Sequence, residues 1–210
     1  MIISLQIMAS AMIFAPEKIE DLKEKELIAN MLLRRRLTRN AKMLIYLADK
    51  LGIKDERIVY GSNYGELQES LLILKNIFAS IQPSPTDFQN SVYNTPSAYL
   101  SILKENRSEI LCVSNGNKTG DNVMQTAAVK ALDEDTIFVA VCESFALEEI
   151  DNKCNAAREC AVGFKIQKSS QKPHVLFDKI KPLNNFVPSV AKLAALYECA
   201  NKSVIVGVEC

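Results

Sequence analysis

Short apolar runs alternate with helix-like apolar stripes along the chain, and this pattern predicts its elements. Strands are predicted where the runs are short and bounded by polar or turn residues: 2–8, 57–62, 110–113, 136–142 and 203–209. Helices are predicted where apolar residues recur every three or four positions: 39–51, 67–78, 96–104, 119–132 and from 188 onward. Strands that alternate with helices indicate an α/β fold of three layers, with a mixed sheet between two helical layers.

Two further segments complete the predicted sheet. Residues 161–167 and 174–180 enclose the polar turn 169–173, and we expect them to form an antiparallel hairpin. Polar residues 143–155 are expected to form a loop, and the helix over 96–104 is expected to turn Ala98, Tyr99 and Ile102 inward. The whole chain, 1–210, is then one domain around a sheet of five or slightly more strands.

Residues 108–132 organise the rest of the chain, because they predict a strand, a sharp turn and a helix in direct succession. Enzymes often present a nucleophile on such an elbow, above a helix N-terminus. The position to inspect is Asn117, and an amide is not a useful nucleophile near neutral pH. The other side chains of the elbow are Ser114, Asn115, Gly116, Lys118 and Thr119.

Composition excludes several classes of protein. The chain has 25 basic and 25 acidic residues, so its total charge indicates neither a nucleic-acid partner nor an anionic membrane. No apolar run approaches the ~20 residues of a membrane helix, and the apolar N-terminus has no basic segment typical of a signal peptide. Six cysteines show neither a CxxC pair nor zinc spacing, which favours reduced thiols and a cytoplasmic protein without metal or cofactor.

Residues 34–39 contain four arginines, which raise the hypothesis of an anionic ligand or an acidic protein partner. The alternative is a structural role, because a helical stripe follows directly and no aromatic residues interleave the run. An arginine at a helix start opposes the helix dipole, so we expect a carboxylate or a partner to meet it.

Several short segments resemble β-ketoacyl synthases in their order and spacing. Arg35-Arg36-Leu37-Thr38-Arg39 resembles an Arg-Arg-Met-Ser-Arg segment that opens a helix in that family. The strand ending at Ser62 and the Ser-Pro-Thr-x-Phe motif ending at Phe88 also have counterparts there. Residues 113–119 align with the Val-Asp-Thr-Ala-Cys-Ser-Ser nucleophile elbow. Closer still is the stand-alone N-terminal domain of aryl polyene clusters, where Ser-Val-His-Asn matches Ser91-Val92-Tyr93-Asn94.

The resemblance covers residues 2–180 and implies half of a thiolase-like fold. Active members use an elbow Cys and two His from a second half, whereas this chain aligns Asn117 with the Cys, ends before a second half and has a single His. We expect that residue, His174, to be structural, and Cys112 to point into the sheet. Condensation by this polypeptide alone is therefore not expected.

Two functions remain open. The first, implied by the resemblance, is a non-catalytic subunit of the chain length factor type, which pairs with an active ketosynthase or with itself and meets an acyl carrier protein through the ketosynthase. Its expected interface and acyl-tunnel residues are Tyr93, Asn94, Tyr99, Ile110, Leu111 and Val113. The second is a small acyl-thioester hydrolase or decarboxylase that uses Ser114 or Thr119, and it requires a nearby base.

Overall fold

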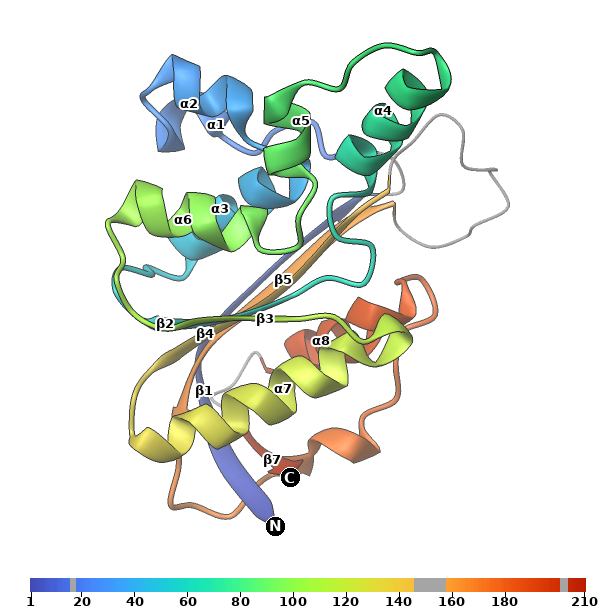
Figure 1. The fold of residues 1–210 in the computed structure, drawn as a ribbon. Helices are drawn as coiled ribbons and strands as arrows, with labels where there is room; N and C mark the ends of the chain where they lie inside the picture. The colour runs from blue at the N-terminus through green and yellow to red at the C-terminus, as the bar shows by residue number, and fades with distance from the viewer. Residues whose placement is uncertain (16–17, 146–157, 201–203) are drawn as a thin grey trace.

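The computed structural model, which describes residues 1–15, 18–145, 158–200 and 204–210, confirms the three-layer α/β architecture (Figure 1). Its mixed sheet has seven strands in the order β3-β2-β4-β5-β1-β7-β6. Their bounds are β1 Ile2–Ala15, β2 Arg57–Gly61, β3 Ile110–Val113, β4 Ile137–Ser144, β5 Glu159–Lys168, β6 Val175–Leu176 and β7 Ile205–Glu209.

Helices cover both faces of this sheet (Figure 1). One layer contains α1 Glu24–Leu27, α2 Met31–Arg36, α3 Arg39–Lys50, α5 Pro85–Asn90 and α6 Thr95–Lys104. The opposite layer contains α7 Thr119–Lys130 and α8 Pro188–Cys199. Helix α4 Leu67–Phe78 follows β2 and packs against α5, and single 3-10 turns occur at Gly116–Lys118, Ala131–Asp133 and Phe177–Lys179.

Strand β4 separates two hydrophobic cores, as its continuous apolar run predicts. Phe138 and Ala140 are fully buried in the core that includes α3 and α6. Val139 and Val141 are fully buried in the core that includes α7 and α8. Successive side chains of a strand point to opposite faces, so one strand supplies both cores.

The predicted hairpin between residues 161–167 and 174–180 is wrong. Strand β5 pairs antiparallel with β4 on one side and with β1 on the other, whereas β6 has only two residues and pairs parallel with β7. The cause is the length of β1, which we expected to end at residue 8 and which continues to Ala15. Its first residues pair with β7, and most of its length pairs with β5. Both sides of β5 are therefore paired, and β6 cannot pair with it.

Two local predictions are also wrong. In α6, Tyr99 and Leu100 face inward as the helix packs on α3, while Ala98 is exposed and Ile102 is 66% exposed. The expected loop from 143 begins too early, because Glu143 and Ser144 continue β4, and its remainder from 146 lies outside the described residues. Of the six cysteines, the five in the described part are free thiols, and Cys154 lies outside it.

Candidate functional site

Strands β2, β3 and β4 are parallel, so their carboxyl ends meet at one end of the sheet, and the predicted elbow lies there. After β3, residues 114–115 lead into the 3-10 turn Gly116–Lys118, and α7 begins at Thr119. Gly116 has φ 54°, a left-handed conformation that glycine adopts without strain. Asn117 lies in this turn with its side chain exposed, directly before the N-terminus of α7.

Thr119 closes the elbow. Its buried hydroxyl donates to Gly116 O at 2.7 Å and accepts from the backbone N–H of Asn115 at 3.0 Å. Both interactions hold the shape of the turn, so this hydroxyl is not directed toward a substrate. Ser114, Asn115, Asn117 and Lys118 are all exposed beside it.

His174 lies far from the elbow. It directly precedes β6, which forms one edge of the sheet, while the elbow follows β3 at the opposite edge. Its Nδ1 accepts a hydrogen bond from the backbone N–H of Ile205 at 3.1 Å. The single imidazole of the chain is therefore engaged in β-sheet structure and cannot activate Ser114.

A buried carboxylate that the sequence reasoning missed anchors the turn after β2, next to the elbow. Glu143, at the end of β4, is fully buried. Its oxygens accept from Ser62 Oγ at 2.9 Å, Asn63 N at 2.6 Å, Tyr64 N at 3.1 Å and Ser189 Oγ at 2.8 Å. Burial raises the pKa of Glu143, and the surrounding donors oppose that rise.

Sequence contained a signal for Glu143. It follows the continuous apolar run of a central strand without an intervening turn residue. A strand that continues by one or two residues places this carboxyl at the sheet end that carries the elbow. The polar run 143–155 predicts a loop at this residue, and this prediction is wrong because β4 continues to Ser144.

The arginine-rich segment has a structural role at Arg39. Its guanidinium binds both carboxylate oxygens of the fully buried Glu159, at 2.8 and 2.6 Å, and donates to Ile19 O at 2.9 Å. The carboxylate that we expected at this helix start is therefore present. The neighbouring Thr38 caps α3 and donates to the buried carboxyl of Glu66 at 3.0 Å. Burial raises the pKa of Glu66 to about 8.

The proposed tunnel residues fall into two groups. Tyr99 is buried and its hydroxyl donates to Asn90 Oδ1 at 3.0 Å, so it joins α6 to α5. Tyr93 is 46% exposed, and its hydroxyl donates to Asn63 O at 3.1 Å in the turn after β2. Its ring covers Gly65, where any Cβ would lie 2.8 Å from a ring carbon. Asn94 and Tyr99 line a surface cavity of about 180 Å³ together with Gln89, Val92, Thr95, Ala98 and Ile102.

Strand β3 ends the sheet order, and its outer edge pairs with no other strand of the described chain. The backbone N–H of Ile58, in β2, donates to the carbonyl of Glu109. The backbone N–H of Ser62, directly after β2, donates to the carbonyl of Val113. Backbone groups alternate along a parallel strand, so those of Ile110 and Cys112 point to the free side. Ile110, Leu111 and Val113 are half-buried there. Cys112 is exposed, with Sγ 3.3 Å from Ser97 Oγ, and does not point into the sheet interior as we expected.

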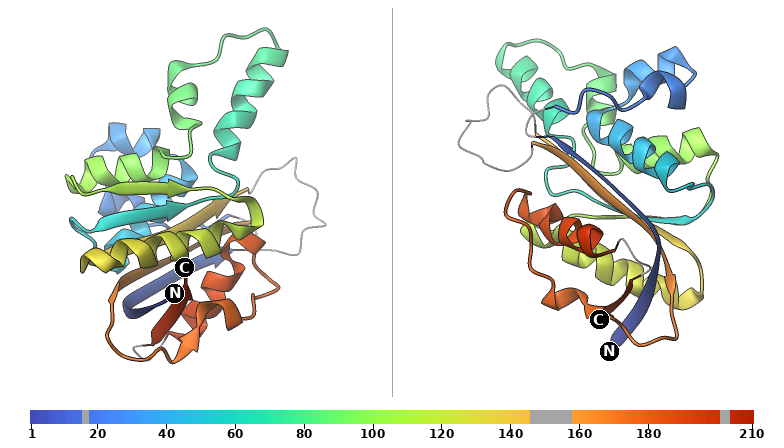
Figure 2. Two further views of the ribbon diagram at one scale, coloured as in Figure 1. Left: turned by 60° about the horizontal axis from the view of Figure 1, so that its bottom comes forward. Right: turned by 180° about the vertical axis from the view of Figure 1, so that it is seen from behind.

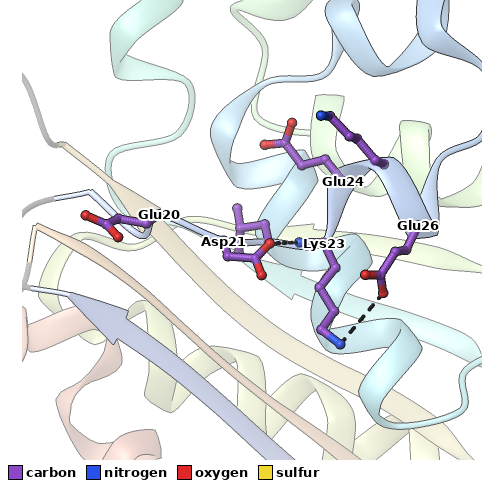
Figure 3. A pocket seen from close by; sticks show the side chains of 7 residues that line it. Glu20, Asp21, Lys23, Glu24 and Glu26 are labelled. Carbon is purple, nitrogen blue, oxygen red and sulfur yellow. Dashed lines mark hydrogen bonds and ion pairs between the residues drawn. The ribbon is translucent and has the colours of Figure 1, made fainter.

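A second concavity, of about 370 Å³, lies beside α1 (Figure 3). Its lining is charged, and Lys23 pairs with Asp21 through its backbone N–H and with Glu26 through its side chain. It belongs to the α3 side of the sheet, whereas the elbow leads into α7 on the other side. Among the described residues, no cluster of His, Cys, Asp or Glu has the geometry of a metal site, and no helix is long and apolar enough to span a membrane.

The family of the chain follows from its sequence match. Residues 11–192 match the model described as "Beta-ketoacyl synthase, N-terminal domain". The chain belongs to this family. No curated protein sequence matches the domain significantly.

Solved structures share its fold. One chain of the ketosynthase ApeO in complex with its chain length factor ApeC, from Xenorhabdus doucetiae, is 19% identical with TM-score 0.69, over 95% of this domain and 92% of that chain. The ishigamide ketosynthase/chain length factor is 15% identical with TM-score 0.59, over 73% of this domain and 50% of that chain. A β-ketoacyl synthase from Burkholderia phymatum is 11% identical with TM-score 0.51, over 67% of this chain and 44% of that chain. The chain thus aligns with about half of these last two chains and with nearly all of the first.

Proposed function

We propose that this chain is a non-catalytic ketosynthase-like subunit of the chain length factor type, which pairs with an active β-ketoacyl synthase. The observation that carries the proposal is the elbow. Its turn presents the exposed amide of Asn117. The sequence resemblance aligns this residue with the nucleophilic Cys of active members of the family. Ser114 and Thr119, the alternative nucleophiles, have no imidazole near them, because His174 lies at the opposite edge of the sheet.

The free edge of β3 supports a partner subunit. An exposed edge with unpaired backbone groups is a site for pairing with another strand. An antiparallel partner strand that uses the outward groups of Ile110 and Cys112 has Leu111 at its centre. The similarity to ketosynthase–chain length factor complexes favours a ketosynthase as the partner over a second copy of this chain.

Tyr93 and Asn94 support a role in limiting the length of the acyl chain. Both are exposed directly before α6, and the Tyr93 hydroxyl reaches Asn63 in the turn beside the elbow. A residue there can close an acyl tunnel that continues from the partner. The structure supports Tyr99 less well as a tunnel residue, because its ring is buried and its hydroxyl donates to Asn90.

The pathway and compartment follow from the resemblance. We place the domain in aryl polyene-type fatty acid or polyketide biosynthesis in the cytoplasm, where the ketosynthase presents the acyl carrier protein. Co-expression with candidate β-ketoacyl synthases tests the proposal. A stable complex whose product becomes longer in Tyr93→Ala supports it, whereas the failure of every ketosynthase to co-purify contradicts it.

A further inference from the structure

Helix α4 has no fully buried face. None of its residues is buried, although it contains seven Leu, Ile and Phe residues. An isolated helix of this length is marginal in water, so most of its stability must come from apolar packing. Within the described chain it packs mainly against the short helix α5.

The exposed apolar side chains of this region lie on α4, on the connection after it and on α5, and we call residues 67–90 the arm. They are Leu72 at 43%, Leu74 at 48%, Ile77 at 56%, Phe78 at 87%, Ile81 at 58% and Phe88 at 70% exposure. Only Glu69, Lys75 and Asp87 carry charge in the whole arm. Several large exposed apolar side chains on one segment that carries few charges are typical of a protein interface.

The arm projects beyond the edge of the sheet. Figure 2 (left) shows α4, the connection after it and α5 rising past β3, the last strand on that side, away from the other strands. A subunit that pairs with the free edge of β3 would therefore lie next to the arm.

We propose that the arm binds the same ketosynthase subunit that pairs with β3, and holds it through Ile77, Phe78 and Phe88. This inference rests on the proposed function for the identity of the partner. The arm adds a second contact, outside the sheet, that is specific to the protruding helix pair. It also explains why α4 retains large apolar residues on a surface that solvent would otherwise cover.

Binding of the purified full-length chain to a purified ketosynthase tests the arm. Phe78→Asp and Ile77→Asp should each weaken binding and raise the dissociation constant at least about tenfold. The reason is that an interfacial apolar side chain is replaced by a charge that must be desolvated. Leu32→Asp is the matched control, since Leu32 is also on a helix and is 67% exposed but lies outside the arm. Its affinity should equal that of the unmodified chain.

Each outcome bears on one claim. If the unmodified chain binds no ketosynthase, both the proposed function and the arm contact fail. If Leu111→Asp abolishes binding while the arm variants bind as tightly as the unmodified chain, the arm contact alone fails. If the arm variants weaken self-association but leave ketosynthase binding unchanged, the arm binds a second copy of this chain. That result also overturns the proposed contact between the arm and the ketosynthase. A photo-crosslinker at residue 78 that captures the ketosynthase, with none captured from residue 32, supports the contact independently of affinity.

Discussion

The side chains of Glu143 and Ser189 meet at 2.8 Å and join the central strand β4 to the first turn of α8. The same carboxylate holds Ser62 Oγ and two backbone N–H groups of the turn after β2. Beside this junction Gly120 of α7 approaches α8 so closely that a Cβ would lie 2.5 Å from Ser189 O. One buried carboxylate therefore fixes the loop and the helix start that surround the elbow.

Glu143→Ala should destabilise the domain strongly. It leaves two hydroxyls and two backbone N–H groups without their acceptor in a buried site, and each buried donor left unsatisfied costs about 1–3 kcal/mol. Urea denaturation measures the change. Glu105→Ala, at an exposed glutamate, is the control and should stay within about 0.5 kcal/mol of the unmodified chain. An equally small effect for Glu143→Ala would contradict the anchoring role.

Glu66 should make stability fall with pH. Its folded-state pKa of about 8 lies above the ordinary value of 4.5, so the fold favours the protonated carboxyl. The contribution is fully present below about pH 4.5 and is lost as pH rises through about 8. Denaturation midpoints from pH 5 to 9 should therefore decline less in Glu66→Gln than in the unmodified chain. Parallel curves for the two proteins would refute this assignment.

Leu111→Asp should abolish association through β3. The substitution places a charge at the centre of the predicted strand pairing, where it would be desolvated without a partner. Sedimentation velocity at tens of micromolar, alone and with a ketosynthase, measures the change, and Met8→Asp is the control because Met8 is 52% exposed on β1. A monomeric unmodified chain under both conditions would rule out the partner hypothesis.

Much of the architecture could be predicted from the sequence, because local apolar patterns determined β2, β3, β4, α3, α7 and α8. The pairing of β5 could not, since it depends on contact with the distant strand β1, whose second half has no polar alternation to mark it as a strand. The orientation of Ile102 was missed because α6 has apolar residues on more than one side. The succession of strand, turn and helix around Asn117 is as the local pattern predicts, whereas Glu143 was missed because the predicted strand ended too early.

Asn117→Cys should create an acylatable thiol without creating a condensing enzyme. The N-terminus of α7 lowers a thiol pKa at this position, and thiolate is the reactive form. Incubation with an acyl-thioester should add one acyl mass to this variant and none to Asn117→Ser. Because no imidazole lies near the elbow, neither variant should form a condensation product with a malonyl-thioester. Such a product from Asn117→Cys alone would show that another group supplies the missing chemistry.

The most direct test of the central claim is the intact mass of the unmodified chain after incubation with an excess of acyl-thioester. The elbow presents an amide at Asn117, and the Thr119 hydroxyl is engaged on both sides. We therefore predict that the mass remains that of the unmodified 210-residue chain, alone and in complex with a ketosynthase. Stoichiometric acylation mapped to Ser114, Thr119 or Cys112 would contradict a non-catalytic subunit.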